Sequence, residues 1–99
     1  MSFFQDLIST AFGGSQYSSK EHFVSEEEIR RLVSQSKVAS LSQQEEKNVE
    51  EALLHARKNG NISVQKIDHV LKNLEHQRKI SSIDREGIVR VFKNYLGSK

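Results

Sequence analysis

The chain has 99 residues and a formal net charge of +2, and it contains no Cys, Pro or Trp. The length suits one domain with a single core, and the absence of Cys excludes disulfides and thiolate metal sites. No apolar run is long enough to span a bilayer, and residues 1–12 lack the basic start and continuous apolar region of a secretory signal. We therefore expect a cytoplasmic protein.

Charge is divided unevenly along the chain. Residues 1–51 carry 5 Lys or Arg and 9 Asp or Glu, whereas residues 52–99 carry 10 and 4. The two halves could attract each other within the fold, or the basic half could face an anionic partner. We favour attraction within the fold, because most surface charge serves only solvation.

The first predicted element is an amphipathic helix over residues 2–12. Its apolar residues recur at helical spacing and form one broad face: Phe3, Phe4, Leu7, Ile8, Ala11 and Phe12. This face must be buried on the protein's own domain, a partner or a second copy. A membrane is disfavoured, because no Lys or Arg precedes Lys20. Residues 13–20, GGSQYSSK, form a predicted flexible linker, so the N-terminal helix and linker occupy residues 1–20.

The next two helices are predicted from their caps. Ser25 followed by Glu28, and Ser42 followed by Glu45, both match the capping box Ser-x-x-Glu. The first of these helices is expected to end near Lys37, where the pattern becomes polar and weak.

The turn Asn59-Gly60-Asn61 is expected to reverse the chain. Gly60 suits the left-handed residue after a helix end, and Ser63 can cap the following helix, whose apolar stripe reaches Leu74. Residues 42–77 therefore predict a central αα-hairpin with a short turn.

The last helix is predicted over residues 83–96. Ser81 and Ser82 are both candidate caps, and Gly97 supplies the stop. No segment shows the alternation of a strand. The sequence thus predicts an all-α fold, a small helical bundle of about four to five helices, with its main domain over residues 21–99.

Residues 55–66 superficially resemble a calcium-binding EF-hand loop, with Gly60 at the position of the sharp turn. Calcium requires oxygen ligands at the first, third, fifth and twelfth positions. Those positions hold His55, Arg57, Asn59 and Lys66. Two cations and a histidine would repel the ion, so we predict no calcium site.

The remaining sequence predicts no enzyme, cofactor or metal centre. His69 and His76 are seven residues apart on one helix, too far to chelate one ion, since zinc sites on helices use a spacing of three or four. There is no Gly-rich phosphate loop, and no catalytic triad can be assigned from the sequence.

The favoured prediction is a small non-enzymatic protein-interaction or regulatory module that uses an apolar helical surface to bind a protein partner or itself. Its predicted partner-binding residues are Phe3, Phe4, Leu7, Ile8 and Phe12.

The alternative is a DNA- or RNA-binding regulator with a helix-turn-helix-like pair over residues 63–77 and 82–96. Its predicted phosphate-contacting cations are Arg78, Lys79, Arg85, Arg90 and Lys93. Two features oppose it: Asp84 and Glu86 lie in the first turn of the second helix, and the turn exceeds the usual three or four residues.

Overall fold

The computed structural model describes residues 17–36 and 41–98. Within these ranges the chain forms four helices and two short strands, whose order and bounds are β1 (Glu21–Phe23), α2 (Glu26–Gln35), α3 (Gln43–Ala56), β2 (Asn61–Ser63), α4 (Val64–His76) and α5 (Ser82–Gly97). The predicted helix over residues 2–12 lies outside the described residues.

A serine caps each of the four described helices. The side chains of Ser25, Ser42, Ser63 and Ser81 each accept a hydrogen bond from the backbone N–H three residues later. Three of these caps are complete capping boxes, closed by Glu28, Glu45 and Asp84. The predicted caps at Ser25, Ser42 and Ser63 are confirmed, and at α5 Ser81 is the cap of the two candidates.

Helix α2 ends slightly before the predicted position. Its C-cap is Ser36, whose hydroxyl donates a hydrogen bond of 2.6 Å to the Val33 carbonyl, and whose N–H bonds to the carbonyls of Leu32 and Val33. This local bonding satisfies the last turn and ends the helix.

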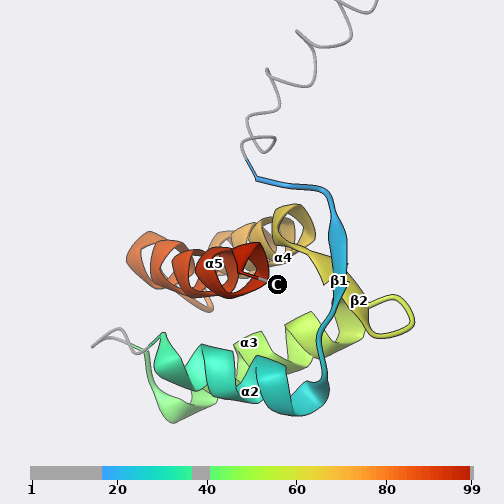
Figure 1. Ribbon diagram of the computed structural model, residues 1–99. Helices are drawn as coiled ribbons and strands as arrows, with labels where there is room; N and C mark the ends of the chain where they lie inside the picture. The colour runs from blue at the N-terminus through green and yellow to red at the C-terminus, as the bar shows by residue number, and fades with distance from the viewer. Residues whose placement is uncertain (1–16, 37–40, 99) are drawn as a thin grey trace, which may run out of the picture.

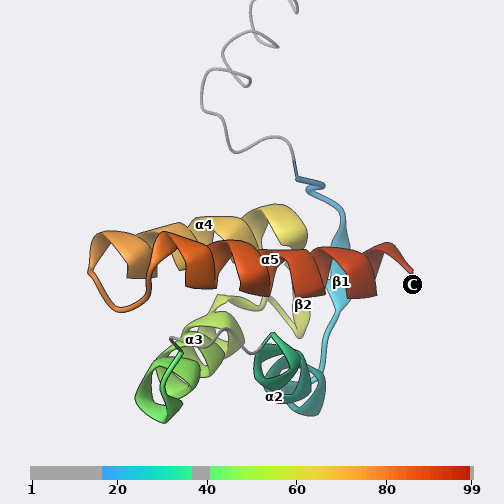
Figure 2. The ribbon, with the colours of Figure 1, turned by 90° about the vertical axis from the view of Figure 1, so that its left-hand side faces the viewer.

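The helices lie in two pairs that are linked by the strands. Helices α4 and α5 pack side by side, as do α2 and α3, and α5 also contacts α2. In Figure 2, α5 is seen from the side and lies across the picture, while α2 and α3 below it are strongly foreshortened, so the two pairs run in different directions. The strands lie on one side of the molecule and connect the two pairs (Figure 1).

The two strands form an antiparallel ribbon that the sequence did not predict. His22 lies opposite Ile62 in the register, and the ladder continues where the Val24 N–H donates a bond of 2.9 Å to the Gly60 carbonyl. The prediction of a fold without strands was therefore wrong at residues 21–23 and 61–63. The molecule is a mostly helical globule with a small two-stranded sheet, and a strand separates the turn at Gly60 from α4.

The start of the described chain is held against the domain, although the sequence assigned it to the linker. Tyr17 packs on the core, and the Ser18 carbonyl accepts a bond of 3.0 Å from the Gln65 N–H in the first turn of α4. Residues 17 and 18 are thus anchored beside α4.

The core is one cluster drawn from all four helices and the ribbon. Its buried hydrophobic members include Val24, Ile29, Leu53, Ile67 and Phe92. The apolar residues Ile88, Phe92 and Leu96 of α5 are buried in this core, whereas Val91 and Tyr95 are only partly buried. No helix among the described residues combines the length and the apolar character needed to cross a membrane.

Gly60 is the backbone position on which the ribbon depends. Its φ is +84°, and a Cβ built there would lie 2.5 Å from Cε1 of Phe23. We expect Gly60→Ala to lower the free energy of unfolding by at least about 1–2 kcal/mol through backbone strain alone. Urea denaturation of the purified variant measures this loss.

The Phe23→Ala background separates strain from steric overlap. The Phe23 side chain is 59% exposed, so its ring can be removed without opening the core. In that background, Gly60→Ala should lower the free energy of unfolding only by the cost of the positive φ, because the clash with the Phe23 ring is absent. Equal stability of the Gly60→Ala variant and the unaltered chain would contradict this account.

Candidate functional site

The structure does not gather the five cations predicted to bind nucleic acid into one surface. Arg78 and Lys79 lie in the turn between α4 and α5, whereas Lys93 lies toward the other end of α5, where it lines a hollow with Tyr17. Arg90 is exposed on α5 between them. Arg85 is the exception, because its guanidinium is used inside the fold.

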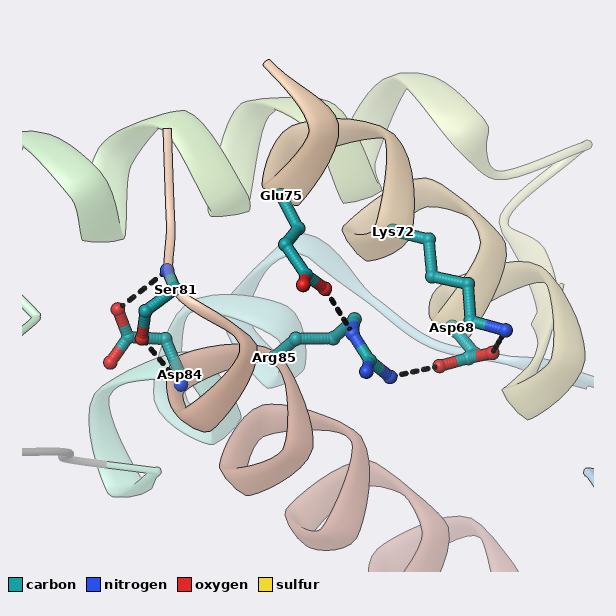
Figure 3. A network of polar contacts seen from close by, with 6 residues as sticks. All are labelled: Asp68, Lys72, Glu75, Ser81, Asp84 and Arg85. Atoms are coloured by element: carbon teal, nitrogen blue, oxygen red, sulfur yellow. Dashed lines mark hydrogen bonds and ion pairs between the residues drawn. The ribbon is translucent and has the colours of Figure 1, made fainter. Parts of the chain in front are cut away.

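Arg85 joins α5 to α4 through two carboxylates (Figure 3). Its Nη1 lies 3.2 Å from Oδ1 of Asp68, and its Nε lies 2.6 Å from Oε1 of Glu75. The Asp68 side chain is only 3% exposed, and Lys72 Nζ lies 3.4 Å from its second oxygen. Arg85 therefore neutralises a buried carboxylate, and a phosphate would have to displace these bonds to reach it.

Charge interactions keep Arg85 protonated in this network. Partial burial alone lowers the pKa of Arg85, but the hydrogen bonds and charges of Glu75 and Asp68 outweigh burial and raise that pKa overall. The pair Arg85–Asp68 is thus a fixed ionic link between the two helices.

Asp84 does not project into solvent from the first turn of α5. Its Oδ2 accepts a bond of 3.1 Å from the Ser81 N–H, and the residue is 1% exposed. The Asp84 carboxylate, which was expected to repel phosphate, is therefore hydrogen-bonded within the helix cap. Ile83, in the same turn, is 66% exposed.

A second polar link joins α2 to α5. The Tyr95 hydroxyl donates a hydrogen bond to Oε2 of Glu28, and the Arg31 guanidinium lies 5.2 Å from the centroid of the Tyr95 ring. The bond to Glu28 raises the pKa of Tyr95. Both contacts are between helices, so these side chains stabilise packing.

A large hollow of the described surface lies where the end of α3, the ribbon and the start of α4 meet. It is an open groove of about 890 Å³. We call it the basic groove, after the four cations that line it: Arg57, Lys58, Lys66 and Lys72. Glu21 and Asp68 are its acidic lining residues, and Asp68 is already paired with Lys72 and Arg85.

Three cations of the basic groove have no carboxylate partner among the described residues. The ion pairs found in those residues involve Arg30, Lys72 and Arg85, and none involves Arg57, Lys58 or Lys66. These three side chains therefore keep their full charge available at the groove.

Arg57 is held in place by backbone carbonyls. Its Nη1 donates a bond of 2.9 Å to the Val24 carbonyl, and its Nε lies 3.5 Å from the Leu54 carbonyl. A guanidinium has five N–H donors, so these two bonds fix its position and leave others for a ligand.

The start of α4 adds little to the charge of the groove. The Lys66 N–H is bound to Oγ of Ser63, and the Gln65 N–H is bound to the Ser18 carbonyl. The backbone donors that commonly bind anions at a helix start are thus occupied. The positive potential of the groove comes from its side chains.

The loop that resembles an EF-hand keeps the sharp turn at Gly60 but places a cation where a ligand would stand. Arg57, at the third position, points its Nη1 at the Val24 carbonyl. Within residues 17–36 and 41–98, no group of three or more His, Asp or Glu side chains could hold a metal ion.

A smaller hollow lies beside the point where the described chain begins. It has a volume of about 430 Å³ and is lined in part by Tyr17, Val64, Lys93 and Leu96. We call it the N-terminal hollow. The predicted partner-binding residues, Phe3, Phe4, Leu7, Ile8 and Phe12, lie outside the described residues.

Sequence reasoning did not identify the basic groove. Arg57 and Lys58 follow a helix end, and Lys66 and Lys72 belong to the next helix, so each has an ordinary local explanation. The available signal was the absence of any Asp or Glu between Glu51 and Asp68. The grouping itself depends on the ribbon, which was not predicted.

Comparisons with protein-family models, with curated proteins and with solved structures found no match to this chain.

Proposed function

We propose that this protein is a small non-enzymatic interaction module, in which the apolar face of residues 2–12 binds a protein partner or a second copy of the chain. The observation that carries the proposal is that several ionisable side chains of the domain are bonded to other groups of the fold. Asp68, Glu75 and Arg85 bind one another, Asp84 closes a cap, and Tyr95 binds Glu28. Apart from the Asp84 cap, these bonds join one helix to another, which supports a function carried by a surface.

The composition of residues 2–12 supports the same proposal. Three of the five Phe of the chain fall in this segment, together with Leu7 and Ile8. Burial of such side chains against a partner could contribute several kcal/mol. The described chain begins at Tyr17, which lines the N-terminal hollow. This hollow is a candidate docking place for residues 2–12 on their own domain.

The test replaces residues of the apolar face and compares them with residues of the polar face. We expect Phe4→Ser with Ile8→Ser to abolish self-association or partner capture while the melting temperature of the domain stays the same. The matched control is Gln5→Ser with Ser9→Ala, which should change neither property. Light scattering measures self-association, and circular dichroism measures the melting temperature.

Unfolding of the apolar-face variant would contradict the proposal. It would show that Phe4 and Ile8 belong to the domain core, in which case the segment is not a binding surface.

Nucleic-acid binding is the alternative proposal. It is supported by the exposure of Arg78, Lys79, Arg90 and Lys93 on the surface. It has less support than the first, because these four cations are spread along α5 and its preceding turn, and Arg85 is bound to Asp68 and Glu75. Binding of labelled duplex that falls steeply with salt would favour it.

A further inference from the structure

We infer that the basic groove is a second binding surface, which takes a short acidic peptide segment of a protein partner. The inference does not depend on residues 2–12, because every side chain that carries it lies at the end of α3, in the turn after α3, in the ribbon or in α4.

Charge complementarity identifies the partner as anionic. Arg57, Lys58 and Lys66 line the groove without a carboxylate within the described part of the chain, and Lys72 adds a fourth cation that Asp68 only partly satisfies. Opposing charges at such a surface speed encounter and fix the register of binding. Carboxylates of a partner would supply the counter-charge that the fold itself does not.

Arg57 is the residue best placed to bind a carboxylate. Its guanidinium is already fixed by the Val24 carbonyl, so little side-chain freedom is lost when a ligand binds. A planar guanidinium can present two parallel N–H groups to one carboxylate. Lys58 and Lys66 are exposed and can adjust to neighbouring acidic residues.

The neutral part of the groove favours a peptide over a nucleic acid. Asn61 and Gln65 offer side-chain amides, and Ala56 contributes apolar atoms. These groups suit the amides and methylenes of a peptide. The volume also lies within the range of about 300–1,000 Å³ that ligand sites occupy.

A nucleic acid would need more cations than the groove holds. A protein that binds duplex through about 6–10 phosphate contacts needs a cation or another donor for each of them. The groove offers three cations that have no carboxylate partner within the described part of the chain. A peptide with two or three acidic residues matches this number better.

The experiment uses the full chain and a fluorescein-labelled decapeptide in which Glu alternates with Ser. Fluorescence anisotropy is measured at low and at physiological salt. The probe should bind, binding should weaken as salt rises, and the same peptide with Gln in place of each Glu should not bind. A labelled DNA duplex is titrated in parallel.

The decisive variant reverses two charges in the groove, Lys58→Glu with Lys66→Glu. It should weaken binding of the Glu peptide at least tenfold. Lys66 is the third residue of α4, where a Glu can close a capping box with Ser63, so the fold should be retained. The control Lys79→Glu with Arg90→Glu makes the same charge change on exposed residues outside the groove and should leave binding within twofold.

Three results would overturn the inference: no binding of the Glu peptide at low salt, equal weakening by both double variants, or tighter binding of the duplex than of the peptide. The variant Phe4→Ser with Ile8→Ser separates this inference from the proposed function. It should bind the Glu peptide as the unaltered chain does, even if residues 2–12 prove to have no binding role.

Discussion

Phe92→Ala should lower the free energy of unfolding by about 3–5 kcal/mol, the range measured for truncating a buried phenylalanine. Phe92 is 0% exposed and is among the largest fully buried side chains of the described core. It lies on α5, the helix that contacts both α4 and α2. Its removal therefore opens a cavity in the core, which neighbouring side chains fill only in part.

Two variants of α5 make the Phe92 measurement specific. Ile83→Ala removes an apolar side chain of the same helix that is 66% exposed, and it should change stability by no more than about 0.5 kcal/mol. Phe92→Leu keeps most of the volume and should cost clearly less than Phe92→Ala. Urea denaturation with a common slope gives all three values. A loss at Phe92→Ala no larger than that at Ile83→Ala would show that the packing is not as described.

The helices and their caps could be predicted because the signals are local. A serine, a carboxylate three residues later and an apolar stripe of period 3.6 all lie within one segment. Thus Ser25 with Glu28, and Ser42 with Glu45, were identified from the sequence and found in the structure. The box at Ser81 uses Asp84, a shorter acid than the motif requires, so the sequence left the cap open between two serines.

The ribbon could not be predicted because its stability comes from pairing across the chain. Each strand has three residues, too few to show an alternating pattern, and His22 pairs with Ile62 forty residues later. Each strand also lies beside local signals that had another explanation: β1 lies between the predicted linker and the cap of α2, and β2 lies at the predicted hairpin turn. Only long-range contacts distinguish these explanations from a strand.

The candidate sites depended on the same long-range information. The sequence shows that Arg85 is basic, but not that Asp68, seventeen residues earlier, would be buried against it. Conversely, Arg57 looked like a cation at a helix end, and the groove that it lines exists because β1 and β2 pair beside it. Charge composition therefore predicted an anionic partner as one option, but the cations selected for it from the sequence are not those that line the basic groove.

The second large effect is expected from breaking the ionic link between α4 and α5. Arg85→Met should lower the free energy of unfolding by about 3 kcal/mol, because it leaves the buried Asp68 carboxylate without its guanidinium. This value is at the low end of the range for breaking a buried ion pair, because Lys72 Nζ remains 3.4 Å from the other Asp68 oxygen. Arg90→Met, an exposed arginine on the same helix, is the matched control and should cost no more than about 0.5 kcal/mol.

A double variant distinguishes the loss of an attractive pair from the burial of an isolated charge. Asp68→Leu with Arg85→Met replaces both partners by apolar side chains of similar size, and it should recover most of the stability lost by Arg85→Met alone. The reason is that desolvation of the Asp68 carboxylate, rather than the missing attraction, dominates the cost of the single change. If the two changes were additive, Asp68 would not be acting through Arg85, and the link between α4 and α5 would have to be assigned to the apolar core alone.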